Sequence, residues 1–134
     1  MEERPLNILV VEPEVILRNA LLAFFEALDD IAPVGSAAHA AEAIQLCQTL
    51  RPDVILMEIQ LPDMKGIEAI RHFRQRCPGV AIVVLTSANQ SDLMRDALLA
   101  GATGWLEKWM SADQVVAALR IAAQKATHHQ NRSS

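Results

Sequence analysis

Short apolar runs alternate with segments of helical periodicity along almost the whole chain. The apolar runs lie at residues 6–11, 31–34, 54–57, 80–85 and 103–106 and are short enough to be strands. Apolar side chains recur at helical spacing over residues 15–28, 39–50, 67–76, 92–100 and 111–126. Five strand-then-helix units predict an α/β fold in which a parallel sheet lies between two layers of helices.

The strands also indicate their own order in the sheet. The runs at 6–11, 54–57 and 80–85 are apolar on both faces, which is typical of central strands. Pro33 removes a backbone donor from the second run, and Gly104 weakens the fifth, so both suit the edges. With right-handed crossovers, these features predict a five-stranded parallel sheet in the order 2-1-3-4-5.

Length and composition indicate one folded domain. The chain has 134 residues, of which 51% are hydrophobic and 21% are charged, so it is not of the disordered class. We expect the domain to span residues 1–126, followed by a polar and frayed tail at 127–134. The formal net charge of −4 disfavours nucleic-acid binding by this surface.

The sequence shows no sign of a membrane or an oxidising compartment. Its longest purely apolar run, residues 80–85, is far shorter than the roughly 20 residues of a membrane helix. The start is acidic and polar, unlike a signal peptide, so we expect a cytoplasmic location. Cys47 and Cys77 match no metal or redox spacing and are interpreted as free thiols.

Polar side chains gather where a ligand would bind such a sheet. Ligands of these folds lie at the carboxyl ends of the strands, beside the reversal between the first and third strands. Those ends carry Glu12, Glu14, Glu58, Thr86 and Lys108. A flavin or nucleotide site is disfavoured, because the first turn lacks phosphate-binding glycines and serines.

Four stretches together resemble one protein family. They are ILVVEPE (8–14), RPDVILMEIQLPDMKGIEAI (51–70), IVVLTSA (82–88) and ALLAGATGWLEK (97–108). On these residues the chain resembles, over residues 6–123, the CheY-like receiver domain of bacterial two-component response regulators. It looks most like regulators that carry a C-terminal helix-turn-helix. The resemblance implies a flavodoxin-like, three-layer α/β/α sandwich and no enzymatic role.

The acceptor position and the acidic pair that carry the family's phosphoryl chemistry depart from its pattern. Glu58 occupies the position of the phosphoacceptor aspartate, and Glu12 and Pro13 occupy those of the acidic pair that holds Mg²⁺. Pro13 has no side-chain oxygen, and a glutamate is one methylene longer than an aspartate. We therefore expect weak Mg²⁺ binding at most and no other cofactor, with Glu12 and Glu14 forming an acidic pocket without a dedicated metal.

The family's remaining signature residues are present. The resemblance makes Thr86 and Trp105 the switch residues and Lys108 the partner of the acceptor side chain. Asp53 and Asp63 are not expected to replace the acceptor. Arg71, Arg74 and Arg76 are expected to form an outward, solvated face of their helix.

The last predicted helix is apolar nearly all round, whereas a surface helix needs only one apolar stripe. We therefore expect an interface, and a weak homodimer, at Trp105, Trp109, Val115, Val116 and Leu119. The alternative is alanine and valine tolerated on an ordinary helix surface.

These features favour an atypical receiver that acts by binding a protein, such as a histidine kinase or an output domain, without normal aspartyl phosphorylation. One alternative is a conventional phosphoryl-accepting receiver of a phosphorelay. Another is the receiver half of a DNA-binding transcription regulator. Whether Glu58 mimics a phosphorylated aspartate or simply neutralises Lys108 is left open.

Overall fold

The computed structural model describes residues 4–86, 91–107 and 110–133 of the chain. Strands and helices alternate throughout. The strands are β1 (Leu6–Val11), β2 (Ile31–Ala37), β3 (Val54–Glu58), β4 (Ala81–Thr86) and β5 (Gly104–Glu107). The helices are α1 (Val15–Glu26), α2 (Ala40–Leu50), α3 (Gly66–Arg76), α4 (Ser91–Ala100) and α5 (Ala112–Ser133).

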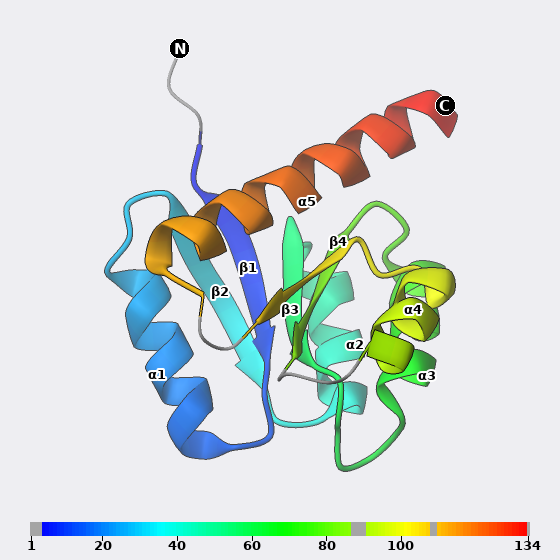
Figure 1. The fold of residues 1–134 in the computed structure, drawn as a ribbon, viewed down its shortest axis with the longest axis horizontal. Coiled ribbons are helices and arrows are strands. Elements are labelled where there is room, and N and C mark those ends of the chain that lie inside the picture. Colours follow the sequence, from blue (N-terminus) through cyan, green and yellow to red (C-terminus); the bar gives the residue numbers. More distant parts are fainter. Residues whose placement is uncertain (1–3, 87–90, 108–109, 134) are drawn as a thin grey trace.

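The five strands form one parallel sheet in the order β2-β1-β3-β4-β5, which confirms the predicted topology. Helices α1 and α5 cover one face of the sheet, and α2, α3 and α4 cover the other (Figure 1). Among the described residues, no helix is long and apolar enough to cross a membrane.

Alternate side chains of the central strands supply two separate cores. Val10 packs with Phe25 and Leu119 on the α1 and α5 side of the sheet. Leu9 packs with Phe73 on the side of α2, α3 and α4. All five side chains are fully buried. Burial on both faces explains why the central strands are apolar at every position.

Pro33 shapes the edge strand β2. The ladder with β1 pairs Ile8 with Pro33 and then Leu9 with Gly35, so the register shifts between the two pairs. Because proline has no backbone N–H to donate, a bulge at an edge strand accommodates it. Beyond the shift β2 continues to Ala37, three residues past its predicted end at residue 34.

The expectation of two free thiols was wrong. Cys47 and Cys77 form a disulfide although 30 positions separate them in the sequence. The two cysteines belong to α2 and to the C-terminal end of α3, which pack side by side, and their Cα atoms lie 6.6 Å apart. The packing of α2 against α3 therefore brings the two cysteines within bonding distance, which their separation in the sequence does not indicate.

Helix α5 continues to Ser133, beyond its predicted end at residue 126. Residues 127–133 contain neither glycine nor proline, so nothing in their sequence ends the helix.

Arg74 does not face solvent as expected for the basic side of α3. Its guanidinium is partly buried and donates hydrogen bonds to the carbonyl oxygens of Gly101, Pro78 and Val80. Burial lowers the pKa of Arg74. Gly101 adopts a φ of 124° at the end of α4, where a Cβ would lie 2.6 Å from the Arg74 side chain. Arg74 thus joins the ends of α3 and α4.

Candidate functional site

The site lies at the carboxyl ends of β1, β3 and β4, at the lower edge of the sheet in Figure 1. Val11 and Met57 are partners in the β1–β3 ladder, so Glu12 and Glu58 each follow a paired residue. Neighbouring strands are about 4.8 Å apart. The fold therefore brings these two glutamates to adjacent positions, as the sequence predicted.

Glu12 is held in place by the first turn of α1. Its side chain is 3% exposed, and its Oε2 accepts a hydrogen bond from the backbone N–H of Glu14, at 3.0 Å. Arg18 donates from Nη1 to the backbone carbonyl of Glu12, at 2.8 Å. A carboxylate at a helix N-terminus is stabilised by the helix dipole. Glu14 itself is exposed, so it forms the rim of the acidic pocket.

Pro13 separates the two acidic residues and offers no side-chain oxygen. Mg²⁺ prefers near-octahedral coordination by oxygen ligands at about 2.0–2.1 Å. Within the described range 4–86, the side-chain oxygens at the end of β1 belong to the buried Glu12, whose Oε2 already accepts a backbone N–H, and to the exposed Glu14. In the part of the chain that the structure describes, no three His, Cys, Asp or Glu side chains are grouped to hold a metal. The residues present therefore do not fit a magnesium site of the receiver type.

Glu58 ends β3 and is only partly buried. Its Oε1 accepts a hydrogen bond from the backbone N–H of Gln60, at 3.3 Å. This contact directs Oε1 of Glu58 toward the loop that follows β3.

Thr86, the last residue of β4, is 3% exposed. Its Oγ1 donates a hydrogen bond to the backbone carbonyl of Leu106 on β5, at 3.3 Å. Trp105 precedes Leu106 and is 45% exposed on this edge strand. Trp105 pairs with Val84 in the β4–β5 ladder, two positions before Thr86, so the two expected switch residues lie on neighbouring strands. Lys108 and Trp109 lie outside the described residues.

The predicted interface helix presents fewer apolar side chains than expected. Leu119 is fully buried in the core, so its assignment to an interface was wrong. Val115 and Val116 are partly buried against the same core. Ile121 is 51% exposed instead. Leu119 lies on the side of α5 that packs on the sheet, in the same core cluster as Leu85 of β4 and Leu106 of β5.

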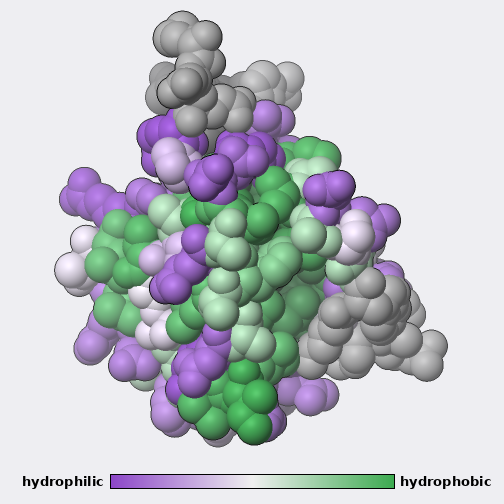
Figure 2. Space-filling model, turned by 90° about the vertical axis from the view of Figure 1, so that its left-hand side faces the viewer, coloured by the Kyte–Doolittle hydropathy of each residue, from purple (hydrophilic) through white to green (hydrophobic). Residues whose placement is uncertain are grey.

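Two residues that the sequence analysis passed over flank the acidic pocket. Val15 and Ile16 begin α1 and are 53% and 76% exposed. The side view in Figure 2 shows apolar surface at the lower end of the molecule, the end at which α1 begins. Both residues fall off the apolar stripe of α1, and that departure is the signal by which the sequence reveals them.

Asp63 has a structural role rather than a chemical one. Its two carboxylate oxygens accept hydrogen bonds from the backbone N–H groups of Ala40 and Ala41, at 2.8 and 2.9 Å, at the start of α2. Burial opposes ionisation of this carboxyl, but the hydrogen bonds from Ala41 and Ala40 outweigh it and lower its pKa. Asp53 lies at the opposite end of β3, in an ion pair with Arg4.

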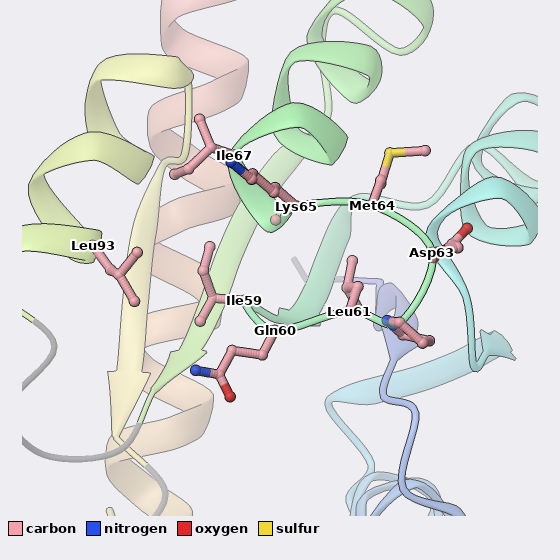
Figure 3. A pocket seen from close by; sticks show the side chains of 10 residues that line it. Ile59, Gln60, Leu61, Asp63, Met64, Lys65, Ile67 and Leu93 are labelled. Carbon is pink, nitrogen blue, oxygen red and sulfur yellow. The ribbon is translucent and has the colours of Figure 1, made fainter.

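The loop that carries Asp63 also borders a shallow hollow of about 510 Å³ (Figure 3). Figure 3 shows Asp63 on the α2 side of this loop and Leu93 of α4 across from Ile59. The lining is mainly apolar, and it consists of Ile59, Gln60, Leu61, Pro62, Asp63, Met64, Lys65, Gly66, Ile67 and Leu93.

Residues 8–120 match the family model of the response regulator receiver domain. The chain belongs to this receiver family. The match runs from within β1 into α5, so it includes the described residues at the carboxyl ends of the strands.

Curated relatives of this receiver are regulators of transcription. It is 30% identical over 129 residues to the transcriptional regulatory protein MctR of Rhizobium johnstonii, covering 96% of this chain and 60% of that protein. It is 34% identical over 119 residues to the transcriptional regulatory protein LiaR of Bacillus subtilis, covering 89% and 56%. The chain thus spans a little over half the length of these relatives.

Solved structures agree with the fold. A LuxR-family two-component response regulator from Aurantimonas sp. SI85-9A1 has a TM-score of 0.83 at 30% identity, covering 90% of this chain and 86% of that one. The response regulator domain of Thermotoga maritima CheB has a TM-score of 0.78 at 27% identity, covering 93% and 98%.

Proposed function

We propose that this receiver is a pseudo-receiver, a protein-interaction module of two-component signalling that works without normal aspartyl phosphorylation. The observation that carries the proposal is a pair of departures at the carboxyl ends of two neighbouring strands: Glu58 at the acceptor position on β3, and Pro13 beside the buried Glu12 after β1. The proposal includes the cytoplasmic location expected from the sequence and no direct contact with nucleic acid or membrane.

Phosphoryl transfer is sensitive to both departures. The reaction depends on positioning of the acceptor and on electrostatic stabilisation by bound metal. The extra methylene of Glu58 moves the acceptor oxygen away from the place where an aspartate would hold it. Pro13 has no side-chain oxygen that could coordinate the metal. Either change alone weakens the transfer, and together they remove both of its main supports.

The carboxylate of Glu58 also gives the module a permanent negative charge near the acceptor position. In this proposal Lys108 pairs with Glu58, and the pair either imitates the phosphorylated state or neutralises the pocket. A desolvated charge requires a partner under both readings. The two readings make different predictions for a variant that lacks the charge of Glu58. Only mimicry predicts that this variant binds more weakly at the docking face described below.

Exposed apolar side chains on successive elements offer a docking face for a partner or a second copy. Leu98 and Leu99 of α4 are 40% and 80% exposed, Trp105 of β5 is 45% exposed and Ile121 of α5 is 51% exposed. Large aromatic residues such as Trp105 often anchor interfaces. Trp109 and Val115 belong to the same proposed face, at which we expect a weak homodimer.

A second candidate function is the receiver half of a DNA-binding transcription regulator. It is supported by the relatives, which are named transcriptional regulatory proteins and of which this chain covers 60% and 56%. This candidate is compatible with pseudo-receiver chemistry, since an output domain is one of the proposed partners.

Phosphorylation by acetyl phosphate tests the proposal. The wild-type protein is incubated with acetyl phosphate and Mg²⁺ and its intact mass is measured, with a Glu58→Asp/Pro13→Asp double variant as the matched positive control. We expect a phosphoryl adduct on the double variant only. An adduct on the wild type that disappears in Glu58→Gln would instead establish a conventional phosphoryl-accepting receiver.

A further inference from the structure

The Cys47–Cys77 disulfide joins the buried Cys47 of α2 to the partly exposed Cys77 at the end of α3, and it plays no part in the proposed signalling chemistry. It borders a hollow of about 560 Å³ formed by the end of α2 and the turn after α3. Disulfides are rare in reducing compartments, and those that occur there are mostly redox-active. The expected cytoplasmic location therefore makes this bond a candidate for exchange with thiols.

The two sulfur atoms differ in their exposure. Cys47 is 1% exposed and lies in the core beneath α2. Cys77 is partly exposed at the C-terminal cap of α3 and begins the turn that leads to Pro78. A thiolate from solvent therefore reaches the sulfur of Cys77 first, because thiol–disulfide exchange requires access to the attacked atom.

Two arginines at this hollow favour a negatively charged ligand. Arg51 and Arg76 both line it and both are exposed. Neither side chain makes a hydrogen bond or an ion pair with another residue in the described ranges 4–86, 91–107 and 110–133. Guanidinium groups bind carboxylates well, through paired N–H donors. The hollow thus combines an accessible disulfide with two cations available to a ligand.

We propose that Cys77 is a site of reversible S-thiolation by a small thiol that carries carboxylates, recognised by Arg51 and Arg76. The thiolate attacks Sγ of Cys77 and forms a mixed disulfide, while the Cys47–Cys77 bond breaks and its electron pair leaves on Cys47. Cys47 then takes a proton from water. Its Sγ lies 3.1 Å from the carbonyl oxygen of Ile44, which accepts a hydrogen bond from the new thiol.

The mixed disulfide reverts when the Cys47 thiolate attacks Sγ of Cys77 and expels the small thiol; alternatively, a second molecule of the same thiol completes the reduction. Its thiolate attacks the small-molecule sulfur of the mixed disulfide, releases Cys77 as a thiolate and leaves as the oxidised dimer. Two small thiols are oxidised while one protein disulfide is reduced, so the electrons balance.

The experiment measures opening of the disulfide in the full 134-residue chain. Protein purified without reductant is treated with reduced glutathione, which carries carboxylates, or with cysteamine, which carries an amine. Acid-quenched samples are analysed by intact mass and peptide mapping. We expect a glutathione adduct on Cys77. In an Arg51→Gln/Arg76→Gln variant we expect its rate of formation to fall about threefold at low salt, while the cysteamine rate does not fall.

An Arg71→Gln variant is the matched control, because Arg71 is an exposed arginine of α3 outside the hollow. It should leave both rates unchanged. Equal loss of the glutathione rate in this control, or no loss in the double variant, overturns the recognition by Arg51 and Arg76. Two freely alkylated cysteines in the untreated protein, or an adduct on Cys47 rather than Cys77, overturns the site itself.

Discussion

The side-chain hydroxyl of Thr86 donates to the backbone carbonyl of Leu106, so a side chain of β4 supports the edge strand β5. A hydroxyl has only one hydrogen to donate. While Thr86 holds Leu106, it cannot also donate to a carboxylate such as Glu58. We therefore expect any hydrogen bond from Thr86 to the pocket to form at the expense of its bond to β5, the strand that carries the exposed Trp105.

Replacing Thr86 by valine tests this link. The Thr86→Val variant keeps the shape of the side chain and loses the donor, so we expect the free energy of unfolding to fall by about 1 kcal/mol in urea. Thr49→Val is the control, because the hydroxyl of Thr49 is exposed and water replaces its bond to Gln45. Equal stability of Thr86→Val and the wild type would mean that the bond does not support β5.

Asp63 should make stability depend on pH. Its pKa is lower in the folded protein than in the unfolded chain, so the ionised carboxylate stabilises the fold. This contribution is fully present above the unfolded pKa of about 3.9 and is lost as the pH falls through the folded pKa. We expect Asp63→Asn to cost about 1 kcal/mol at pH 7 and nothing below the folded pKa.

Denaturation in urea across a pH series measures this effect. Asp29→Asn is the control, since Asp29 is an exposed aspartate in the loop before β2. A constant difference between Asp63→Asn and the wild type at all pH values would contradict the capping role of the charge.

Arg74 should matter more for stability than its neighbour on α3. Arg74→Met removes a charged donor from three carbonyl groups, and we expect a loss of about 2–3 kcal/mol in the free energy of unfolding. Arg71→Met removes an exposed arginine and should change stability by less than about 0.5 kcal/mol. Thermal unfolding followed by circular dichroism compares the two, and similar losses would disprove the anchoring role.

Restoring a magnesium site should need two substitutions. Glu58→Asp supplies an acceptor of the family type, but Pro13 still lacks an oxygen ligand. Glu58→Asp with Pro13→Asp should bind Mg²⁺ at least about tenfold more tightly than Glu58→Asp alone. Losing even an outer-shell partner of a metal site costs roughly tenfold in affinity, and the aspartate introduced at position 13 would be a direct ligand. Quenching of tryptophan fluorescence on titration measures the binding. Equal affinity in the single and double variants would refute the account of Pro13.

The proposed dimer should be weak and should use α4. Association costs several kcal/mol and burial returns about 25 cal/mol per Å², so a modest apolar patch gives a dissociation constant near the micromolar range. Leu99→Lys should raise that constant about tenfold or more. Ile16→Lys is the matched control, because Ile16 is 76% exposed and Leu99 is 80% exposed, but Ile16 lies on α1.

Analytical ultracentrifugation over a concentration series measures the dimer. A monomer at every concentration removes the dimer from the proposal. Glu58→Gln, tested in the same way, separates the two readings of Glu58, because only mimicry predicts that the dimer weakens when this charge is removed.

The sequence predicted the sheet because each strand is dominated by one local property. Continuous apolar character marked β1, β3 and β4 as central, and Pro33 marked β2 as an edge. The adjacency of Glu12 and Glu58 followed from the order of the strands alone. These features depend on backbone pairing, which the pattern of residues along the chain largely determines.

The errors concern contacts between elements that are distant in the sequence. The Cys47–Cys77 bond and the Arg74–Gly101 hydrogen bond both depend on how α2, α3 and α4 pack. Leu119 was misplaced for the same reason, because an apolar helix does not itself reveal which side meets the sheet. Such contacts are set by the angle and depth of helix packing, which a residue pattern constrains only weakly.

The bulge at Pro33 bears on how this protein avoids aggregation. A regular edge strand presents a row of free donors and acceptors on which another chain can add a strand. At β2 that row is interrupted where Pro33 lacks its N–H and the register shifts, and at the opposite edge β5 is only four residues long. Neither margin of the sheet is a good template for growth, so contacts with other molecules are directed to the helices and to the loops at the strand ends.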